Sequence, residues 1–471
     1  MRFSLSSSSA LLKRYSLSSS ERSSSPTGTV SISKIREYTS FSLQRKIIIP
    51  GVKVAKLKPP QIILLSYVLL ILTGTLLFLY TPATRREIDP IDAFFTATSA
   101  VTVTGLVVLD PGRDLNLWGQ AILLMLIQTG GLGYMALTTF FLVVLGRRIG
   151  LRERLILAES LNYPGLYGLV RFLKRVVIFA VLAELTGFLL LLPPFLERFS
   201  TAEAVLLALF HAVSAFNNAG FSLFSDSLSG FRGDVYVSAV VMVLVVLGGV
   251  GFFVINELYL LARGRVRRLS THTKLVLSVS GLLILGGWVA LLMTEWGHDR
   301  GIWSLGWGKR LLTTLFLSVS SRTAGFSTVD LAELSESSLF LIMMLMFIGA
   351  SPGGTGGGIK TTTFAVIVLS VISYIRGSGE VRVFERSIGN AQIHRAMVIL
   401  SLSILYVSLT NLLIDRLEER DFLSTLFEVL SAFSTVGLSV GSGEGLSFSA
   451  QFGSTAKVLI ALSMIVGRVG I

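Results

Sequence analysis

Cysteine is absent from the sequence, and histidine occurs only four times. Without cysteine the chain can form no disulfide, no thiolate zinc site and no cysteine nucleophile. The histidines are scattered at positions 211, 272, 298 and 394, and no two have the spacing that places two imidazoles on one face of a helix. Because no nucleophile–base pair or cluster of metal ligands stands out either, we do not expect an enzyme.

Charged residues are also scarce, at 15% of the chain, whereas 52% of the residues are hydrophobic and the mean hydropathy is +0.73. This composition is too apolar for a soluble globular protein and predicts an all-α polytopic membrane protein. A net charge of +13 could suit nucleic acid, but most basic residues lie in short loops between apolar spans. Such loops set the orientation of the spans instead.

The distribution of these basic residues predicts the orientation. The connections that we assign to the cytosol contain 23 Lys and Arg residues, and the other side, with the pore-helix segments, contains 11, including Arg322. We therefore expect a multi-pass plasma-membrane protein with a cytosolic N-terminus. Residues 1–54 are serine-rich and basic and are predicted to be a disordered cytosolic tail. The alternative for this segment is a transit peptide, which would place the protein in an organelle membrane.

Long apolar spans occur in pairs, and each pair encloses a shorter segment that ends in a similar phrase. The phrases are SAVTVTGLVV, SAFNNAGFSL, SSRTAGFSTV and SAFSTVGLSV, and they place a glycine at positions 105, 220, 325 and 437. The predicted spans are residues 61–80, 118–146, 171–194, 234–262, 275–294, 338–375, 392–415 and 455–471. Because the chain ends at Ile471 without a basic segment after the last span, we expect the last helix to be truncated.

The near-constant spacing of these glycines defines four repeats, at residues 55–150, 151–265, 266–380 and 381–471. Each repeat is predicted to contain an outer helix, a half-length pore helix, a glycine-containing extended segment (the filter) and an inner helix. This order, abbreviated M1-P-M2, is the layout of tetrameric cation channels. Four copies in one chain would surround a single central pore with pseudo-fourfold symmetry.

The four extended segments are the predicted ion site. Non-helical backbone at membrane depth must be buried in protein or line a wet cavity, because lipid cannot form hydrogen bonds with it. If the segments converge, their carbonyl oxygens replace the water around a monovalent cation, and the pore helices direct their partly negative C-terminal ends at it. The predicted filter, with the cation bound by carbonyls around its four glycines, consists of Val103, Thr104, Gly105, Asn218, Ala219, Gly220, Thr323, Ala324, Gly325, Thr435, Val436 and Gly437.

Other polar residues near these segments are expected to have structural partners. Asp92, Glu203 and Asp421 lie near the N-terminal ends of the pore helices, where they are predicted to cap the helices and to suit the helix dipole. Asn217 and Asn218 are expected to brace the second filter glycine. Acids inside a membrane are functional candidates by default, but we expect three of them to be paired or interfacial: Glu184, Glu257 and Glu428.

The four phrases, together with the stretch GGTGGGIKTT at residues 353–362, resemble the membrane subunits of the Trk/Ktr/HKT superfamily of potassium transporters, most closely the Ktr type. The resemblance covers about residues 55–471. It implies potassium as the substrate, no covalently bound cofactor, and a homodimer with one pore per protomer. It also implies control by a separate cytosolic nucleotide-binding ring of RCK type and, in many Ktr systems, activation by sodium. Plant relatives that favour sodium carry serine in the first filter segment, whereas this chain has Gly105.

The stretch GASPGGTGGGIKTTT at residues 349–363 is a near miss for a phosphate-binding loop, because Ile359 separates the last glycine from Lys360. It is instead the third copy of a glycine cluster that recurs at a similar distance after each filter glycine. We expect close helix packing at the first two copies. In the third copy, Ser351-Pro352 and the glycines should unwind the helix into a loop that can plug or clear the pore.

Arg468 replaces a glycine in the fourth copy. It is expected to face the cavity below the filter, to repel potassium there and to donate hydrogen bonds to loop carbonyls. Lys360 would either contact the cavity or anchor the loop. In the family the corresponding loop and arginine are described as the gate, so the predicted gate consists of Gly353, Gly354, Thr355, Gly356, Gly357, Gly358, Lys360 and Arg468.

The alternatives to a potassium transporter are a sodium-permeable or non-selective cation channel of the same superfamily, the membrane subunit of an ATPase, and a regulatory scaffold.

Overall fold

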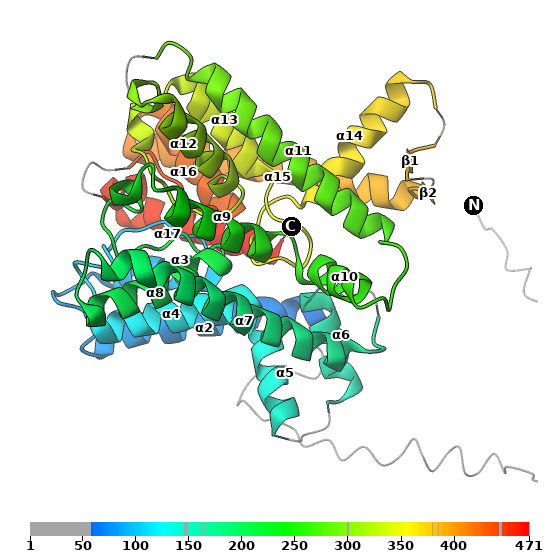
Figure 1. Ribbon diagram of the computed structural model, residues 1–471, viewed down its shortest axis with the longest axis horizontal. Coiled ribbons are helices and arrows are strands. Elements are labelled where there is room, and N and C mark those ends of the chain that lie inside the picture. The colour runs from blue at the N-terminus through cyan, green and yellow to red at the C-terminus, as the bar shows by residue number, and fades with distance from the viewer. Residues whose placement is uncertain are drawn as a thin grey trace, which may run out of the picture. The chain divides into compact units, whose positions relative to one another are not determined.

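The computed structural model is built mostly from α-helices, which confirms the predicted all-α membrane architecture (Figure 1). It describes residues 58–471 except for 146–148, 162, 164, 299–300, 379, 385, 442–444 and 471. The predicted tail at residues 1–54 lies outside the described residues. Within the described residues the strands are limited to one small hairpin of β1 (Arg382–Val383) and β2 (Arg386–Ser387).

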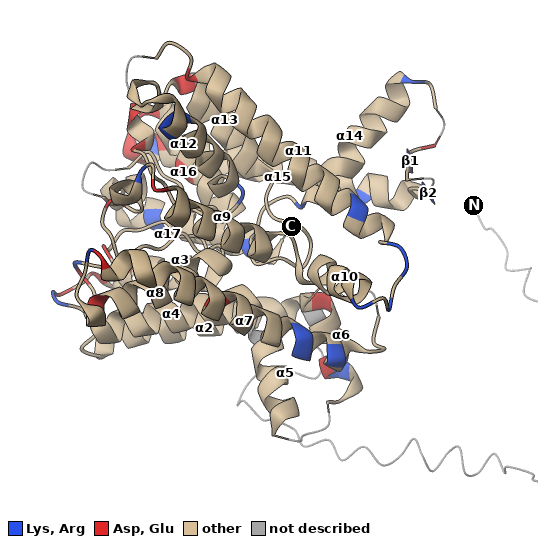
Figure 2. Ribbon diagram, viewed as in Figure 1, with Lys and Arg blue, Asp and Glu red and all other residues tan. Residues whose placement is uncertain are grey.

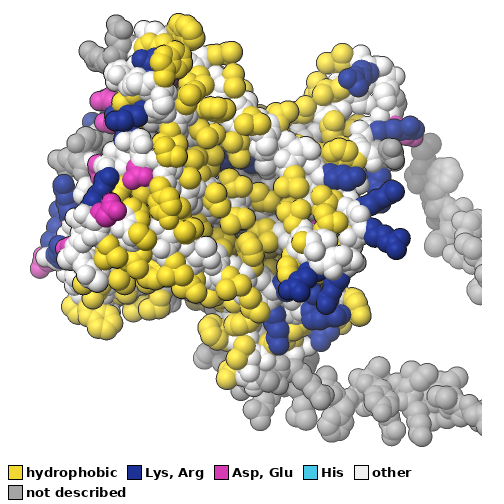
Figure 3. Space-filling view, viewed as in Figure 1, with side chains coloured by type: hydrophobic (Ala, Val, Ile, Leu, Met, Phe, Trp, Pro, Cys, Tyr) yellow, Lys and Arg dark blue, Asp and Glu magenta, His cyan; other side chains and the backbone are white. Residues whose placement is uncertain are grey.

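Four long helices are the outer helices of the repeats: α2 (Pro59–Tyr80), α7 (Leu169–Leu196), α11 (Thr271–Thr294) and α15 (Asn390–Glu418). With 22 to 29 residues, each is long enough to cross the roughly 30 Å hydrocarbon layer. Large apolar side chains remain exposed along them, as is typical of faces that contact lipid. Figure 3 shows this apolar surface, and Figure 2 shows that Lys, Arg, Asp and Glu gather mostly towards the ends of the helices.

Four shorter helices follow the outer helices and are the pore helices: α3 (Pro90–Thr102), α8 (Thr201–Phe216), α12 (Trp307–Ser320) and α16 (Phe422–Ser434). They have 13 to 16 residues, too few to span a membrane, and their C-terminal halves are buried. Two of the predicted caps are present. The Glu203 carboxylate accepts a hydrogen bond from the Ser200 N–H at 3.3 Å, and Asp421 accepts one from the Ser424 N–H at 2.8 Å. Asp92 lies in the first turn of α3, where an acid suits the helix dipole, but the capping prediction was wrong, because its carboxylate pairs with a lysine instead.

The inner helices are broken in three repeats. The pair α4 (Leu117–Leu132) and α5 (Tyr134–Val144) bends by 92°, and the pair α9 (Val235–Gly249) and α10 (Phe252–Ala262) bends by 99°. In the third repeat, α13 (Glu336–Phe347) and α14 (Thr361–Ile375) are separated by the loop at residues 348–360. The fourth inner helix is α17 (Ser454–Val469). By length and composition, four described helices can cross a membrane alone, or up to six spans exist if each bent pair counts as one.

The bends correct one expectation from the sequence. The glycine clusters of the first two repeats do pack closely, since a Cβ atom on Gly130 or Gly248 would collide with a carbonyl oxygen of a pore helix. They also end the helix, because Gly133 and Gly251 have φ values of 83° and 100° that other residues rarely adopt. The inner helices therefore break at the same level in three successive repeats.

The remaining short elements connect the repeats. Helix α6 (Leu151–Ser160) lies between the first two repeats. The other connections include four single turns of 3₁₀-helix: η2 (Ser229–Phe231), η3 (Gly301–Ser304), η4 (Leu331–Glu333) and η5 (Phe448–Gln451).

The four repeats close into a ring. The inner helix of each repeat packs against the pore helix of the next: α4 on α8, α9 on α12, α13 on α16, and α17 on α3. The last of these contacts joins the fourth repeat to the first. A buried apolar cluster seals that junction and includes Phe95 of the first repeat and Met464 of the fourth. This order of contacts confirms the predicted arrangement of four M1-P-M2 units.

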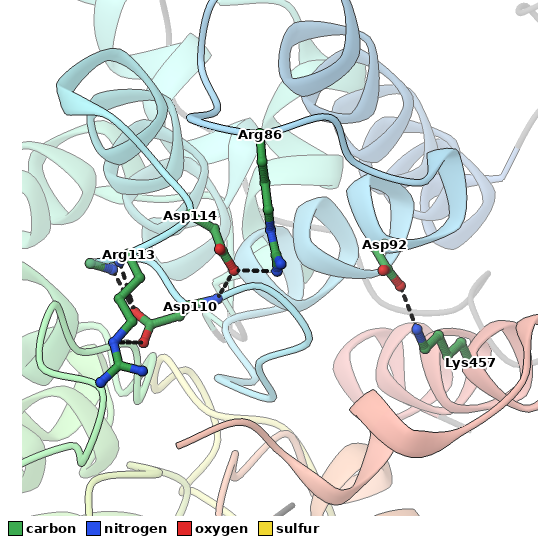
Figure 4. Close-up of polar contacts among 7 residues, drawn as sticks. Arg86, Asp92, Asp110, Arg113, Asp114 and Lys457 are labelled. Carbon is green, nitrogen blue, oxygen red and sulfur yellow. Dashed lines mark hydrogen bonds and ion pairs between the residues drawn. The ribbon is translucent and has the colours of Figure 1, made fainter. Parts of the chain in front are cut away.

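An ion pair crosses the same junction. The Lys457 Nζ lies 2.6 Å from the Asp92 Oδ1, and the two side chains are 13% and 20% exposed (Figure 4). Removing one partner leaves a mostly buried charge alone, so we expect Asp92→Asn or Lys457→Met to destabilise the protein by about 2 kcal/mol. The double variant should lose less than the sum of the single losses.

Thermal unfolding of the purified protein in detergent measures this coupling. The control is Glu380→Gln, which removes an exposed ion pair of similar length (3.0 Å to Arg382) and should cost less than about 0.5 kcal/mol. Additive losses at Asp92 and Lys457, no larger than that of the control, would show that the junction does not depend on the pair.

Candidate functional site

The same backbone turn follows each pore helix. It begins with a residue of positive φ and reaches a glycine of positive φ two residues later. The first residues are Val103, Asn218, Thr323 and Thr435, with φ from 50° to 76°. The glycines are Gly105, Gly220, Gly325 and Gly437, with φ from 70° to 93°. All twelve predicted filter residues therefore lie in four matching turns, and the φ values explain why glycine recurs at the third position.

The four turns meet one another in a closed order. A Cβ atom added to any of the four glycines would lie within 3 Å of the carbonyl oxygen that precedes the next glycine. The pairs are Gly105 with Ala219, Gly220 with Ala324, Gly325 with Val436, and Gly437 with Thr104. Because the last pair leads back to the first repeat, the glycines form a ring that has room for glycine only.

Serines at the ends of the pore helices hold the turns in place. Their carbonyl oxygens accept hydrogen bonds from the N–H groups that precede the filter glycines, at 2.8 to 2.9 Å. Their hydroxyls act in two ways, two as hydrogen-bond acceptors and two as donors. Those of Ser99 and Ser431 accept from the N–H of Gly105 and Gly437, whereas Ser214 and Ser320 donate to the carbonyls of Phe221 and Phe326. The sequence prediction missed these serines, although each one opens its repeat's phrase.

A cavity of about 320 Å³ opens on one side of the ring. All four filter glycines line it, together with Asp110, Asp226 and Asp330, and we call it the aspartate cavity. Figure 4 shows how the first of these acids is fixed: the Asp110 N–H donates to the Asp114 carboxylate at 2.9 Å, which also pairs with Arg86 at 2.9 Å. The cavity therefore presents negative charge directly next to the ring.

The glycine-rich loop between α13 and α14 lies on the other side of the ring. A Cβ atom on Gly356 would collide with the Thr323 hydroxyl, and one on Gly357 would lie 2.6 Å from the Thr435 hydroxyl. The Gly357 N–H also donates to that hydroxyl at 2.8 Å. Two predicted gate glycines thus touch the first residues of two filter turns.

Hydrogen bonds attach the loop to the broken inner helices. The N–H groups of Ser351 and Thr355 donate to the carbonyls of Gly249 and Gly248 at the end of α9, both at 3.1 Å. The Gly358 N–H donates to the Gly467 carbonyl of α17 at 3.3 Å. A helix that ends inside a protein leaves its last carbonyls without helical partners, and here the loop supplies the donors.

Arg468 uses helix-end carbonyls in the same way. Its Nη2 donates to the carbonyls of Gly130 at 2.5 Å and Gly131 at 3.3 Å, and its Nε donates to the Tyr67 hydroxyl at 3.2 Å. The prediction that it would bond loop carbonyls was wrong, because the break after α4 offers free acceptors nearer to it. Lys360 does bond the loop, since its Nζ donates to the Gly356 carbonyl at 2.8 Å.

Both cations line a second cavity of about 300 Å³, which we call the arginine cavity. Its lining includes Gly353, Gly354, Gly356 and the exposed Arg395. Lys360 therefore anchors the loop and faces the cavity, so both interpretations from the sequence apply to it. The remaining gate residue, Thr355, is fully buried.

Sequence reasoning missed one buried cation. Arg322 belongs to the phrase SSRTAG and was counted among the connections outside the membrane, but its side chain is buried behind the third filter turn. Its Nη2 donates to the Gly349 carbonyl, at the start of the loop, at 3.3 Å. The arginine in the phrase itself was the available signal.

The arrangement suits the passage of a positive ion. A ring of carbonyl-bearing turns separates an aspartate cavity from an arginine cavity, and oxygen atoms from backbone are ligands that alkali cations accept. Four helix C-termini, each with a partial negative charge, end at the ring.

Comparisons with known proteins agree with this geometry. Residues 58–471 match the TrkH family, described as cation transport protein. The Ktr system potassium uptake protein B of Bacillus subtilis (strain 168) is 36% identical over 419 residues, which cover 89% of this chain and 92% of that protein. The potassium/sodium uptake protein NtpJ of Enterococcus hirae is also 36% identical, over 88% of this chain and 92% of its own length.

A solved structure has the same fold. The potassium transporter TrkH from Vibrio parahaemolyticus superposes with a TM-score of 0.70 at 20% sequence identity, over 88% of this chain and 84% of that one. Because the family match extends from the first described helix to the end of the chain, and two relatives are 36% identical over almost their full length, the chain belongs to the TrkH family of cation transport proteins.

Proposed function

We propose that this chain takes up potassium across the plasma membrane through the ring of four filter turns. The observation that carries the proposal is the closed order of the turns, in which each filter glycine faces the carbonyl that precedes the next one. A potassium ion can exchange its hydration water for such a set of carbonyl oxygens. The four pore-helix ends add partial charges of about −0.5 each at the same place.

The relatives support potassium as the ion, because two of those with 36% identity are named as the potassium uptake protein B of a Ktr system. Gly105 in the first turn agrees with this, since serine at that place accompanies sodium preference in plant relatives. A filter that passes sodium as well is the second candidate, and the name potassium/sodium uptake protein NtpJ is the observation that favours it. Sodium as an activating ion is part of the same proposal.

The two cavities have different roles in this account. The aspartate cavity concentrates cations at the entrance of the filter, because negative side chains in a cleft raise the local cation concentration. On the other side, Gly356 and Gly357 block the path directly beneath the turns, and Arg468 and Lys360 add positive charge that repels a passing cation. The loop at residues 348–360 and Arg468 are thus the gate of the proposed pathway.

We also propose the position of the chain in its membrane and its partners. The N-terminus and the arginine cavity face the cytosol, in agreement with the excess of Lys and Arg on that side. The chain acts as the membrane subunit of a larger system, as the names of its Ktr relatives indicate for those proteins. We expect a homodimer with one pore per protomer, controlled by a separate cytosolic nucleotide-binding ring of RCK type.

A substitution in the ring tests the filter. Gly325→Ser forces an L-residue into a positive φ and pushes a side chain against the Val436 carbonyl, which costs about 1–3 kcal/mol and disturbs the oxygen ring. We expect potassium uptake to fall by about tenfold or more, or the preference for potassium over sodium to decrease. Uptake of both ions by proteoliposomes measures this.

The matched control is Gly281→Ser in α11, where an added Cβ atom meets nothing within 4 Å. It should behave as the wild type. If Gly325→Ser keeps wild-type uptake and selectivity as well, the ring is not the filter.

Removing the plug tests the gate. Deletion of residues 353–358 takes away the backbone that touches Thr323 and Thr435, and Arg468→Gln removes one positive charge from the arginine cavity. We expect both changes to raise cation flux in proteoliposomes that contain the membrane subunit alone. Arg395→Gln, at an exposed position lining the same cavity, should change the flux little. Unchanged flux in both gate variants would rule out the assigned role.

A further inference from the structure

Three polar side chains from different elements meet behind the second filter turn. Glu184 of α7, Gln128 of α4 and Asn217 at the end of α8 form what we call the glutamate cluster. Asn217 is fully buried, and Glu184 is 9% exposed. The cluster lies outside the filter turns and the gate, and the pathway described above does not use it.

The cluster leaves one buried acceptor without a donor and gives its carboxylate only side-chain amide donors. The Asn217 Nδ2 lies within hydrogen-bond distance of three oxygens: Gln128 Oε1 at 2.8 Å, Val213 O at 2.9 Å and Glu184 Oε1 at 3.1 Å. Val213 O already accepts the backbone N–H of Asn217 at 3.0 Å, so the two amide hydrogens can serve Gln128 Oε1 and Glu184 Oε1. The Gln128 Nε2 donates to Glu184 Oε2 at 3.1 Å, and the Asn217 Oδ1 is buried without any partner. Exchanging the assignment of the Asn217 amide oxygen and nitrogen would place the amide oxygen among these three oxygens and leave more acceptors without a donor.

The negative charge of the cluster also has no counterpart. The ion pairs found among the described residues do not include Glu184, and its hydrogen-bond partners are two neutral amides. A carboxylate at this depth in a membrane protein needs a positive partner or a set of strong donors.

A second buried acid shows what a satisfied carboxylate looks like in this protein. Glu428 of α16 is fully buried and accepts from the Ser439 hydroxyl at 2.7 Å, the Ser449 hydroxyl at 2.5 Å and the Ser449 N–H at 2.9 Å. Both of its oxygens have donors, and the hydroxyls can rotate to suit either charge state. Glu184 has one amide donor on each oxygen but no hydroxyl and no backbone N–H, and the neighbouring Asn217 Oδ1 has no donor at all.

We infer that the glutamate cluster is a binding site for a small monovalent cation. The Glu184 carboxylate, Gln128 Oε1 and Val213 O already converge on the position of one nitrogen, and rotation of the Asn217 amide adds its Oδ1 as a further oxygen ligand. A proton on Glu184 or an alkali cation among these oxygens supplies the missing positive charge. Oxygen-only surroundings suit either ion.

The site touches both the second filter turn and the end of α4. Asn217 directly precedes the second filter turn, and it packs so closely against Gly131 that a Cβ atom there would collide with its Oδ1. Gly131 lies at the end of α4, where Arg468 also binds. Occupation of the site therefore braces the second filter turn against the inner helix of the first repeat, next to the gate arginine.

The test measures binding without transport, so a failure of the proposed filter leaves it valid. Thermal unfolding of the full chain in detergent is followed while sodium chloride or potassium chloride replaces choline chloride at constant ionic strength, and separately while the pH is lowered at constant salt. We expect one of these cations to raise the unfolding midpoint of the wild type and Glu184→Gln to lose that part of the response. Glu428→Gln is the matched control and should keep it.

The three titrations identify the ion. A response to pH alone assigns a proton, and a response to sodium or potassium assigns the alkali cation. If Glu184→Gln does not fold, Gln128→Met, at a half-buried position, should raise the cation concentration needed for the half-maximal shift by about tenfold. Identical responses of the wild type and the folded variant to all three cations would overturn the inference.

Discussion

Non-helical backbone inside a membrane must find its hydrogen-bond partners within the protein, because the lipid offers none. The four filter turns meet this requirement with serines of their own pore helices, whose carbonyls and hydroxyls bond the turns. The pore helices are too short to span, so they can end at the ring, and the outer helices separate them from the lipid. The fold therefore follows from the need to hold four extended segments at one level in the bundle.

The same requirement explains the opposite side of the ring. Three inner helices break at one level, and the breaks leave carbonyls that the helix no longer uses. The loop at residues 348–360 bonds the carbonyls at the end of α9, and Arg468 bonds those at the end of α4. The features proposed as the gate thus also complete the hydrogen bonding of the broken helices. Moving the loop or Arg468 requires new donors for these carbonyls, which water in the arginine cavity can provide.

Much of this organisation was predictable from the sequence. Four glycines in register gave the repeats, the short pore helices and the position of all four filter turns, because glycine at positive φ leaves a clear signal. The bends after α4 and α9 were not foreseen, since their glycines stand among helix-forming residues and the close contact with a pore helix is a tertiary feature. The partners of Asp92, Arg468 and Arg322 could not be read from spacing either, because each one lies in a different repeat or across a loop.

The most direct test of the central claim is to locate the ion. An experimental structure determined in rubidium, which scatters more strongly than potassium, should show the ion inside the ring formed by the carbonyl oxygens of Thr104, Ala219, Ala324 and Val436. In a structure determined in sodium alone, the ion density at this position should be weaker or absent if the ring selects potassium. Rubidium bound elsewhere in the bundle, with none in the ring, would contradict the account.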